Sequence, residues 1–135
     1  MNEPKAQAGL RGKKSGHLIY LVDDEPMLLE LASAILAPLR YAIETYSSAE
    51  EAFHAFEIAE PKPALIVTDC TMQRMNGLEL TEACRRIRPN QKVLLISGTV
   101  GSEVYEGSAV LTDRFLAKPY KAKELIGAVK KILAG

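Results

Sequence analysis

Side chains that could bind a metal ion or donate a hydrogen bond stand directly after four short apolar segments of the sequence. They are Asp23, Asp24 and Glu25 after the first segment, Asp69 after the second, Ser97-Gly98-Thr99 after the third, and Lys118-Pro119 after the fourth. Taken singly, each has an ordinary structural role, because an Asp in such a position often caps a helix and a Ser often lies in a turn. Together they supply carboxylates, a hydroxyl and an ammonium group, which can act jointly if the segments end at one place.

Three of the carboxylates predict a cation site. Asp23, Asp24 and Asp69 would repel one another at close range, and a divalent cation would relieve that repulsion. Hard oxygen ligands with coordination positions left for water favour Mg²⁺. We therefore expect Mg²⁺, with Mn²⁺ as an alternative.

The same set of groups suits the transfer of a phosphoryl group. Asp69 would be the nucleophile and would form an acyl phosphate. The cation and Lys118 would neutralise charge on the transferring oxygens, and Ser97 would offer a hydroxyl donor. Gly98 would leave the phosphoryl oxygens unobstructed.

These residues are positioned by strands and helices that alternate along the chain. Apolar or alternating runs predict strands at residues 18–22, 41–46, 64–67, 93–96 and 114–117. Amphipathic stretches between them predict helices. The alternation predicts an α/β fold, a doubly wound five-stranded parallel sheet with helices on both faces. Ligands of such sheets bind at the carboxyl ends of the strands, which is where the polar residues stand.

Two details of the helices can also be predicted. The apolar stripe of the first helix consists of Leu28, Leu31, Ile35 and Leu39. We expect this stripe to face the core. Asn76, followed three residues later by Glu79, fits the start of a helix with a capping box.

The composition excludes several classes of protein. The chain has 135 residues, 47% of them hydrophobic and 25% charged, with a formal net charge of zero. General nucleic-acid and membrane binders need a basic excess, which is absent. No apolar run approaches the ~18 residues of a membrane span, and the apolar stretch of a signal peptide is missing. Cys70 and Cys84 match no metal or redox spacing, so we expect a reducing compartment and a cytoplasmic location.

Residues 1–16 differ from the rest of the chain. They carry four cationic side chains and one anionic side chain, a net charge of +3. We expect a disordered basic leader, with an electrostatic contact to an acidic partner as the alternative. Residues 17–135 then form the folded domain.

Four segments together resemble the signature of response-regulator receiver domains of two-component signalling. They read LVDDEP, IVTDCTMQRMNGLEL, LLISGT and FLAKPY, and the resemblance covers about residues 17–134. It implies a flavodoxin-like fold with strand order 2-1-3-4-5. It fits both a free-standing receiver and one at the C-terminal end of a hybrid sensor kinase.

The resemblance implies roles for individual residues. Asp24 and Asp69 are similar to the direct metal ligands, together with the backbone carbonyl of Thr71. Asp23 is similar to the carboxylate that holds the metal through water. Thr71 and Thr99 stand where residues tune the lifetime of the acyl phosphate, and neither orients an attacking water well. Our hypothesis is therefore slow autodephosphorylation.

The remaining implied roles concern phosphorylation and switching. Asp69 would be the phosphoacceptor, assisted by Lys118, and the bond from Lys118 to Pro119 would be cis. Ser97 would close on the phosphoryl group while Phe115 turns inward, which would change a protein-binding surface. One departure from the usual pattern is Gln73, which stands after Met72 where Pro is common.

The resemblance also implies partners. A histidine kinase or a histidine phosphotransfer protein would supply the phosphoryl group, and a downstream protein target would receive the signal. We expect no direct nucleic-acid or membrane contact and no turnover of a small molecule. The cognate kinase, the pathway and a homodimer formed on phosphorylation are left open by the sequence.

Two other functions are weighed against this one. A pseudo-receiver would fold and bind partners without being phosphorylated, and the intact site residues argue against it. A Mg²⁺-dependent phosphohydrolase with an aspartyl nucleophile would place two aspartates two positions apart, whereas Asp23 and Asp24 are adjacent.

Overall fold

A parallel sheet with helices on both faces forms the domain. In this computed structural model, residues 17–98 and 114–134 are described. The strands are β1 (Leu18–Val22), β2 (Ala42–Tyr46), β3 (Leu65–Asp69), β4 (Val93–Ser97) and β5 (Arg114–Ala117). All are parallel, in the order β2-β1-β3-β4-β5. The predicted fold class and strand order are confirmed.

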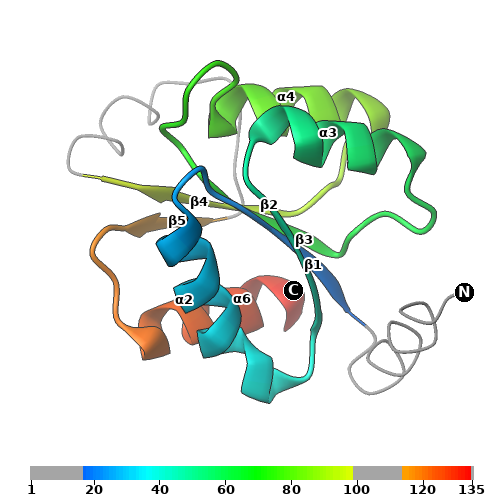
Figure 1. Cartoon of the computed structure of the whole chain (residues 1–135). Coiled ribbons are helices and arrows are strands. Elements are labelled where there is room, and N and C mark those ends of the chain that lie inside the picture. The colour runs from blue at the N-terminus through cyan, green and yellow to red at the C-terminus, as the bar shows by residue number, and fades with distance from the viewer. Residues whose placement is uncertain (1–16, 99–113, 135) are drawn as a thin grey trace, which may run out of the picture.

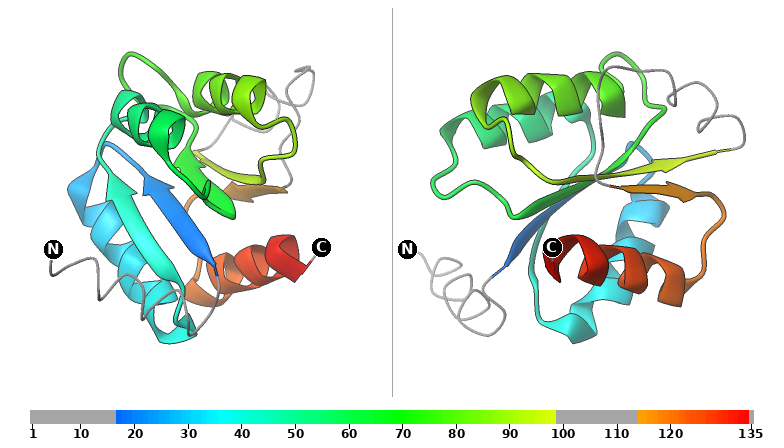
Figure 2. Two further views of the ribbon diagram at one scale, coloured as in Figure 1. Left: turned by 90° about the vertical axis from the view of Figure 1, so that its right-hand side faces the viewer. Right: turned by 180° about the vertical axis from the view of Figure 1, so that it is seen from behind.

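Two pairs of helices cover the sheet. They are α2 (Pro26–Leu36), which continues into the short 3-10 helix η1 (Ala37–Leu39), α3 (Ala49–Ile58), α4 (Gly77–Ile87) and α6 (Ala122–Ala134). Figure 1 shows α3 and α4 on one face and α2 and α6 on the other, and Figure 2 shows the same layers from the side and from behind. None of the described helices is long and apolar enough to cross a membrane.

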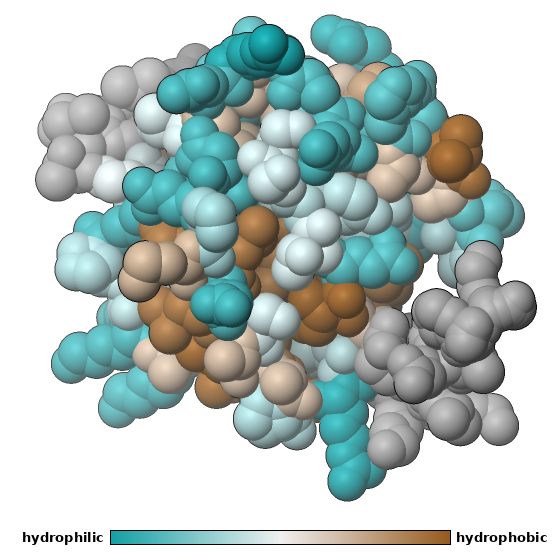
Figure 3. Space-filling model, viewed as in Figure 1, coloured by the Kyte–Doolittle hydropathy of each residue, from teal (hydrophilic) through white to brown (hydrophobic). Residues whose placement is uncertain are grey.

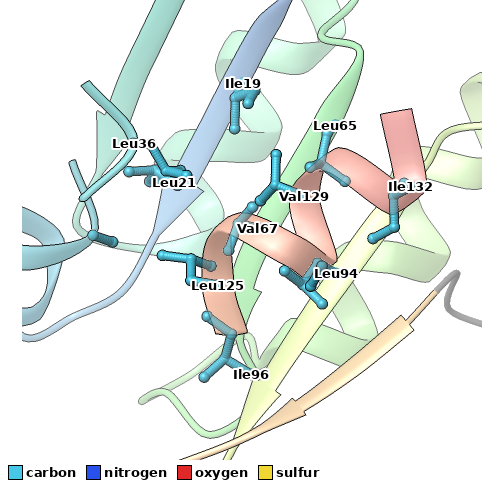
Figure 4. Packing of buried hydrophobic residues seen from close by; sticks show 12 residues of the cluster. Ile19, Leu21, Leu36, Leu65, Val67, Leu94, Ile96, Leu125, Val129 and Ile132 are labelled. Atoms are coloured by element: carbon cyan, nitrogen blue, oxygen red, sulfur yellow. The ribbon is translucent and has the colours of Figure 1, made fainter. Parts of the chain in front are cut away.

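Alternation along the strands divides the core into two layers. Successive side chains of a strand point to opposite faces, so neighbouring positions enter different layers. In β1, Leu21 packs with α2 and α6, whereas Tyr20 packs with α3 and α4. Figure 4 shows Leu125, Val129 and Ile132 of α6 directed at the strands. Both faces of the central strands are therefore buried, which explains their nearly continuous apolar sequence.

The apolar stripe predicted for the first helix is confirmed for Ile35 and Leu39, which pack against the core, and is wrong for Leu31. Ala32 and Leu36 are the buried residues of this helix, while Leu31 is 50% exposed. Apolar residues occupy so many positions of α2 that their spacing does not select one face. The contact with the sheet decides, and it buries Ala32 and Leu36. In Figure 3, apolar surface gathers over the half of the molecule that contains α2, whereas hydrophilic side chains predominate over α3 and α4.

The start of α4 is fixed as the sequence predicts. The Asn76 side chain accepts a hydrogen bond from the backbone N–H of Glu79 at 2.8 Å. The Glu79 carboxylate accepts one from the backbone N–H of Asn76 at 2.9 Å. This capping box satisfies two backbone donors that the helix itself leaves unpaired.

A buried polar residue, Gln91, secures the opposite end of the sheet. Its side chain is fully buried and donates to the carbonyls of Pro63 and Lys92 at 3.0 and 3.1 Å. Arg88 donates to its amide oxygen at 3.2 Å. Gln91 thereby ties together the segments that lead into β3 and β4, a role that its position in a polar loop sequence does not indicate.

Gly127 lies on the exposed side of α6 and allows the stability of this helix to be tested. A Cβ added at this glycine would meet nothing within 4 Å, and its backbone is helical. Gly127→Ala should therefore raise the free energy of unfolding by about 0.5–1 kcal/mol, because Gly inside a helix costs that much relative to Ala. Urea denaturation of the two proteins measures this difference. A loss of stability would contradict the open surface seen around this residue.

Candidate functional site

The candidate site lies where the strands end. Asp69 is the last residue of β3 and Ser97 the last of β4, while Asp23 and Lys118 directly follow β1 and β5. The backbone N–H of Lys118 donates to the carbonyl of Ser97 at 2.7 Å, which continues the pairing of β4 and β5 by one step. The parallel register therefore brings the polar ends of four strands to one edge of the sheet.

Three carboxylates cluster at this edge. Oxygen atoms of Asp23, Asp24 and Asp69 all lie within 4.8 Å of one another. The Lys118 Nζ lies 3.3 Å from Oδ1 of Asp69 and 3.9 Å from Oδ2 of Asp23. One ammonium group thus lies close to two of the three acidic groups, and a cluster of carboxylate oxygens fits a hard divalent cation such as Mg²⁺.

The environment opposes ionisation of two of these acids. Burial raises the pKa of the Asp69 carboxyl, and the Lys118 charge and a hydrogen bond from the Thr71 backbone N–H work against that rise. Burial also raises the pKa of Asp23, with a further rise from the Asp69 charge, while the Glu25 backbone N–H opposes it. In both cases the raised pKa means that the ionised form is disfavoured. A bound cation would stabilise that form.

Backbone donors hold the two acids that follow β1. The N–H of Glu25 donates to Oδ1 of Asp23 at 2.9 Å. The N–H of Gln73 donates to Oδ2 of Asp24 at 3.4 Å across the site. Asp24 is exposed, whereas Asp69 is only 7% exposed. Within the cluster, Asp69 is therefore the buried carboxylate and Asp24 the one that faces solvent.

The residues expected to switch, Ser97 and Phe115, lie in β4 and β5. Ser97 is buried, and its hydroxyl donates to the carbonyl of Gly98 at 3.3 Å. Phe115 is partly buried against the layer formed with α3 and α4. The peptide bond between Lys118 and Pro119 is cis.

The two threonines expected to tune the acyl phosphate differ in what the structure shows. Thr71 is exposed and follows Asp69 by two positions. Thr99 lies outside the described residues. The backbone N–H of Thr71 donates a hydrogen bond to the Asp69 carboxylate, so the main chain of Thr71 is part of the site.

Gly77 permits α4 to begin close to β3. Its backbone N–H donates to the carbonyl of Cys70 at 3.0 Å, which closes the loop after Asp69. A Cβ at Gly77 would lie only 2.3 Å from the carbonyl oxygen of Asp69 and 3.1 Å from its carbonyl carbon. No side chain fits there, so this glycine is required for the loop to take its path.

The structure adds Tyr120 to the surroundings of the site. It is partly buried against the layer formed with α2 and α6. Burial raises the pKa of its phenol, and the nearby Asp23 charge raises it further. Its position directly after Pro119 is the only signal in the sequence that places it here.

An open cleft borders the exposed side of the cluster. It has a volume of about 550 Å³. Its lining consists of Asp24, Ser47, Ser48, Glu50, Glu51, Met72, Gln73 and Arg74. Asp24 is thus accessible from the cleft between the segment after β2 and the segment after β3.

Comparison with known proteins gives one family. The family described as the response regulator receiver domain matches residues 19–130. The chain is 34% identical to the nitrogen assimilation regulatory protein NtrX of Azorhizobium caulinodans over 124 residues, which cover 87% of this chain and 26% of NtrX. It is 26% identical to the response regulator protein TodT of Pseudomonas putida over 130 residues, 94% of this chain and 56% of TodT. The chain thus spans about half or less of the length of these relatives.

Solved structures share the fold. A CheY-like response regulator receiver domain protein from Methanospirillum hungatei has a TM-score of 0.77 and 26% identity, covering 87% of this chain and 94% of that chain. A response regulator receiver domain protein from Clostridium thermocellum has a TM-score of 0.79 at 21% identity, over 87% of this chain and 94% of that chain. At that lower identity the likeness concerns the fold alone.

The charge balance of the cluster predicts an effect of Asp23→Asn. Because the folded-state pKa of Asp23 is raised, its ionised form costs stability at neutral pH. Without divalent cations, Asp23→Asn should therefore increase the free energy of unfolding. The gain should fade as pH falls through the folded-state pKa, where the wild-type carboxyl becomes neutral. Adding Mg²⁺ should stabilise the wild type more than the variant.

Urea denaturation at several pH values, with and without Mg²⁺, measures these differences. Glu30→Gln on the exposed side of α2 is the matched control, because it removes one negative charge away from the cluster. A loss of stability in cation-free Asp23→Asn would refute the repulsion argument.

The close contact at Gly77 predicts that substitution by Ala destabilises the domain, whereas substitution by Ala at Gly127 should stabilise it. Gly77→Ala should lower the free energy of unfolding by about 2 kcal/mol or more, because the methyl group would overlap the Asp69 carbonyl. Thermal and urea denaturation measure the loss, and Gly127→Ala serves as the control for the change from Gly to Ala. Equal effects of the two substitutions would show that the close approach at Gly77 is not needed.

Proposed function

The chain belongs to the response regulator receiver domain family, and we propose that within a two-component phosphorelay it accepts a phosphoryl group on Asp69. Receiver domains are regulators that interact with histidine kinases and downstream effectors, and they bind Mg²⁺ at an acidic pocket. The observation that carries the proposal is the placement of Asp69. It ends β3 with an ammonium group 3.3 Å from its carboxylate and two further carboxylates beside it.

The donor set of the site supports the expected cation ligands. Asp24 and Asp69 would contribute carboxylate oxygens directly, Thr71 its backbone carbonyl, and Asp23 an oxygen through water. When bound, Mg²⁺ would neutralise negative charge on the phosphoryl oxygens. Mn²⁺ would satisfy the same oxygen ligands.

The proposed transfer makes one bond and breaks another. A carboxylate oxygen of Asp69 attacks the phosphorus of a phosphohistidine, the new O–P bond forms, and the N–P bond to the donor imidazole breaks. The imidazole nitrogen leaves with the bonding electron pair. Lys118 lies close enough to Asp69 to interact with a phosphoryl oxygen there. Positioning and charge neutralisation supply the catalysis. Because the acceptor is Asp69 of the chain itself, no turnover of a small-molecule substrate is expected.

A change in the Ser97 hydrogen bond would couple phosphorylation to the surface. The Ser97 hydroxyl now donates to the Gly98 carbonyl, and a phosphoryl oxygen on Asp69 would offer a stronger, charged acceptor. A shift of Ser97 toward it would leave space for the partly buried Phe115 to turn inward. The face of β5 and α6 would then present a different surface to a downstream protein.

The remaining expectations become part of the same proposal. Residues 17–135 act as the receiver unit, and residues 1–16 act as a basic leader. Thr71 and Thr99 set a slow loss of the phosphoryl group. The domain acts in the cytoplasm, a setting that suits two buried cysteines, neither of which forms a disulfide.

Phosphorylation from a small donor tests the proposal directly. Incubation with acetyl phosphate and Mg²⁺ should add about 80 Da to the intact mass, the size of one phosphoryl group. Removal of Mg²⁺ should suppress the gain, and Asp69→Asn should abolish it. Intact-mass spectrometry with matched circular dichroism spectra measures both.

The controls separate the proposal from its alternatives. A folded wild type that binds Mg²⁺ and gains no mass would be a pseudo-receiver. Continuous release of phosphate over many turnovers would indicate a phosphohydrolase. Ser48→Ala, which removes the side-chain cap of α3, is a control variant because it changes a hydroxyl outside the proposed chemistry.

A further inference from the structure

Each carboxylate of the cluster accepts a hydrogen bond from a backbone N–H. Asp23 accepts from Glu25, and Asp69 accepts from Thr71. The N–H of Gln73 donates to Asp24 from the loop after β3. The first contact spans two residues and is local, whereas the third joins positions 49 residues apart in the sequence. It therefore depends on the tertiary fold.

Asp24 needs such a restraint more than its neighbours. Asp69 is buried and paired with Lys118, and Asp23 is also within reach of that ammonium group. Asp24 is exposed, and both neighbouring acids repel its charge. An exposed carboxylate beside two like charges gains rotamer freedom and loses repulsion by turning away. The Gln73 N–H, which donates to Oδ2 of Asp24 from the loop after Asp69, counteracts this tendency.

The loop holds the Gln73 N–H firmly in place. Met72, directly before it, is buried in the layer formed with α3 and α4, and so is Cys70. The Gly77 N–H closes the loop onto the Cys70 carbonyl. The Gln73 side chain itself is exposed. The buried Met72 before Gln73 and the closed loop after it therefore fix the backbone of Gln73, and its exposed side chain does not contribute.

We propose that the backbone N–H of Gln73 is a positioning group for the cation site, which holds the Asp24 carboxylate in a direction suited to a divalent cation. This inference rests on the proposed function, since it assumes that Asp24 is a ligand. A residue without an N–H at position 73 cannot provide the contact, and proline is the only such residue among the standard amino acids. The loop and the cation site are therefore thermodynamically linked through one backbone donor.

Two substitutions separate the backbone from the side chain. Gln73→Ala keeps the N–H and Gln73→Pro removes it, so Ala is the matched control. The dissociation constant for Mg²⁺ is measured by NMR titration, and the melting temperature is measured without divalent cations. We expect Mg²⁺ to bind Gln73→Ala like the wild type and to bind Gln73→Pro about five-fold more weakly. The melting temperature without cation should not fall in parallel, as it would for a purely structural role.

A second background tests that the effect acts through Asp24. With Asp24→Ala present, which leaves no acceptor for the N–H of residue 73, Gln73→Pro and Gln73→Ala should bind Mg²⁺ equally. If the proline variant does not fold, replacing the amide at position 73 by an ester through semisynthesis removes the N–H without a ring, and the same weakening is expected.

The outcomes distinguish the inference from the proposed function. Equal Mg²⁺ affinities of the proline or ester protein and of Gln73→Ala would overturn the role of the N–H while leaving the cation site intact. A five-fold loss that persists with Asp24→Ala would also overturn it. Failure of the wild type to bind Mg²⁺ would refute the cation site, and the inference with it.

Discussion

The organisation of this domain depends on the crowding of like charges at one edge of a parallel sheet. Three carboxylates with oxygens within 4.8 Å of one another face a single lysine ammonium group. Such an arrangement is unfavourable by itself, and burial raises the pKa of both Asp23 and Asp69. Two apolar layers, one on each face of the sheet, provide the stability that keeps the strand ends together. A bound divalent cation would relieve the repulsion within this cluster.

Main-chain groups complete the site that the side chains begin. The N–H groups of Glu25, Thr71 and Gln73 each reach one carboxylate. Two of them belong to the loop between Asp69 and Gly77, whose path requires a residue without a side chain at its end. Changes in this loop would therefore alter the acids without replacing any of them. The capping box at the start of α4 also helps to define the path of this loop, because it fixes the point at which the loop becomes a helix.

The last two strands link the site to the surface of the domain. Ser97 ends β4 beside Ala117 of β5, and the Lys118 N–H continues that pairing. Phe115 lies two residues earlier on the same edge strand and is only partly buried. A new charge at Asp69 would therefore act on groups joined by backbone hydrogen bonds to β5. This short connection is the physical basis of the proposed switch, in which local electrostatics select between two packings.

The sequence by itself determined the five strands, their parallel arrangement and the residues at their ends, because apolar runs and their spacing depend on local chemistry alone. It also predicted the capping box at Asn76, which needs only two residues three apart. Packing decided the rest. The buried face of α2 could not be read from a helix with apolar residues on several sides, and Gln91 became structural only when two distant segments met around it. The hydrogen bond from Gln73 to Asp24 likewise exists only in three dimensions, since its partners are 49 residues apart in the chain and almost every residue carries a backbone donor.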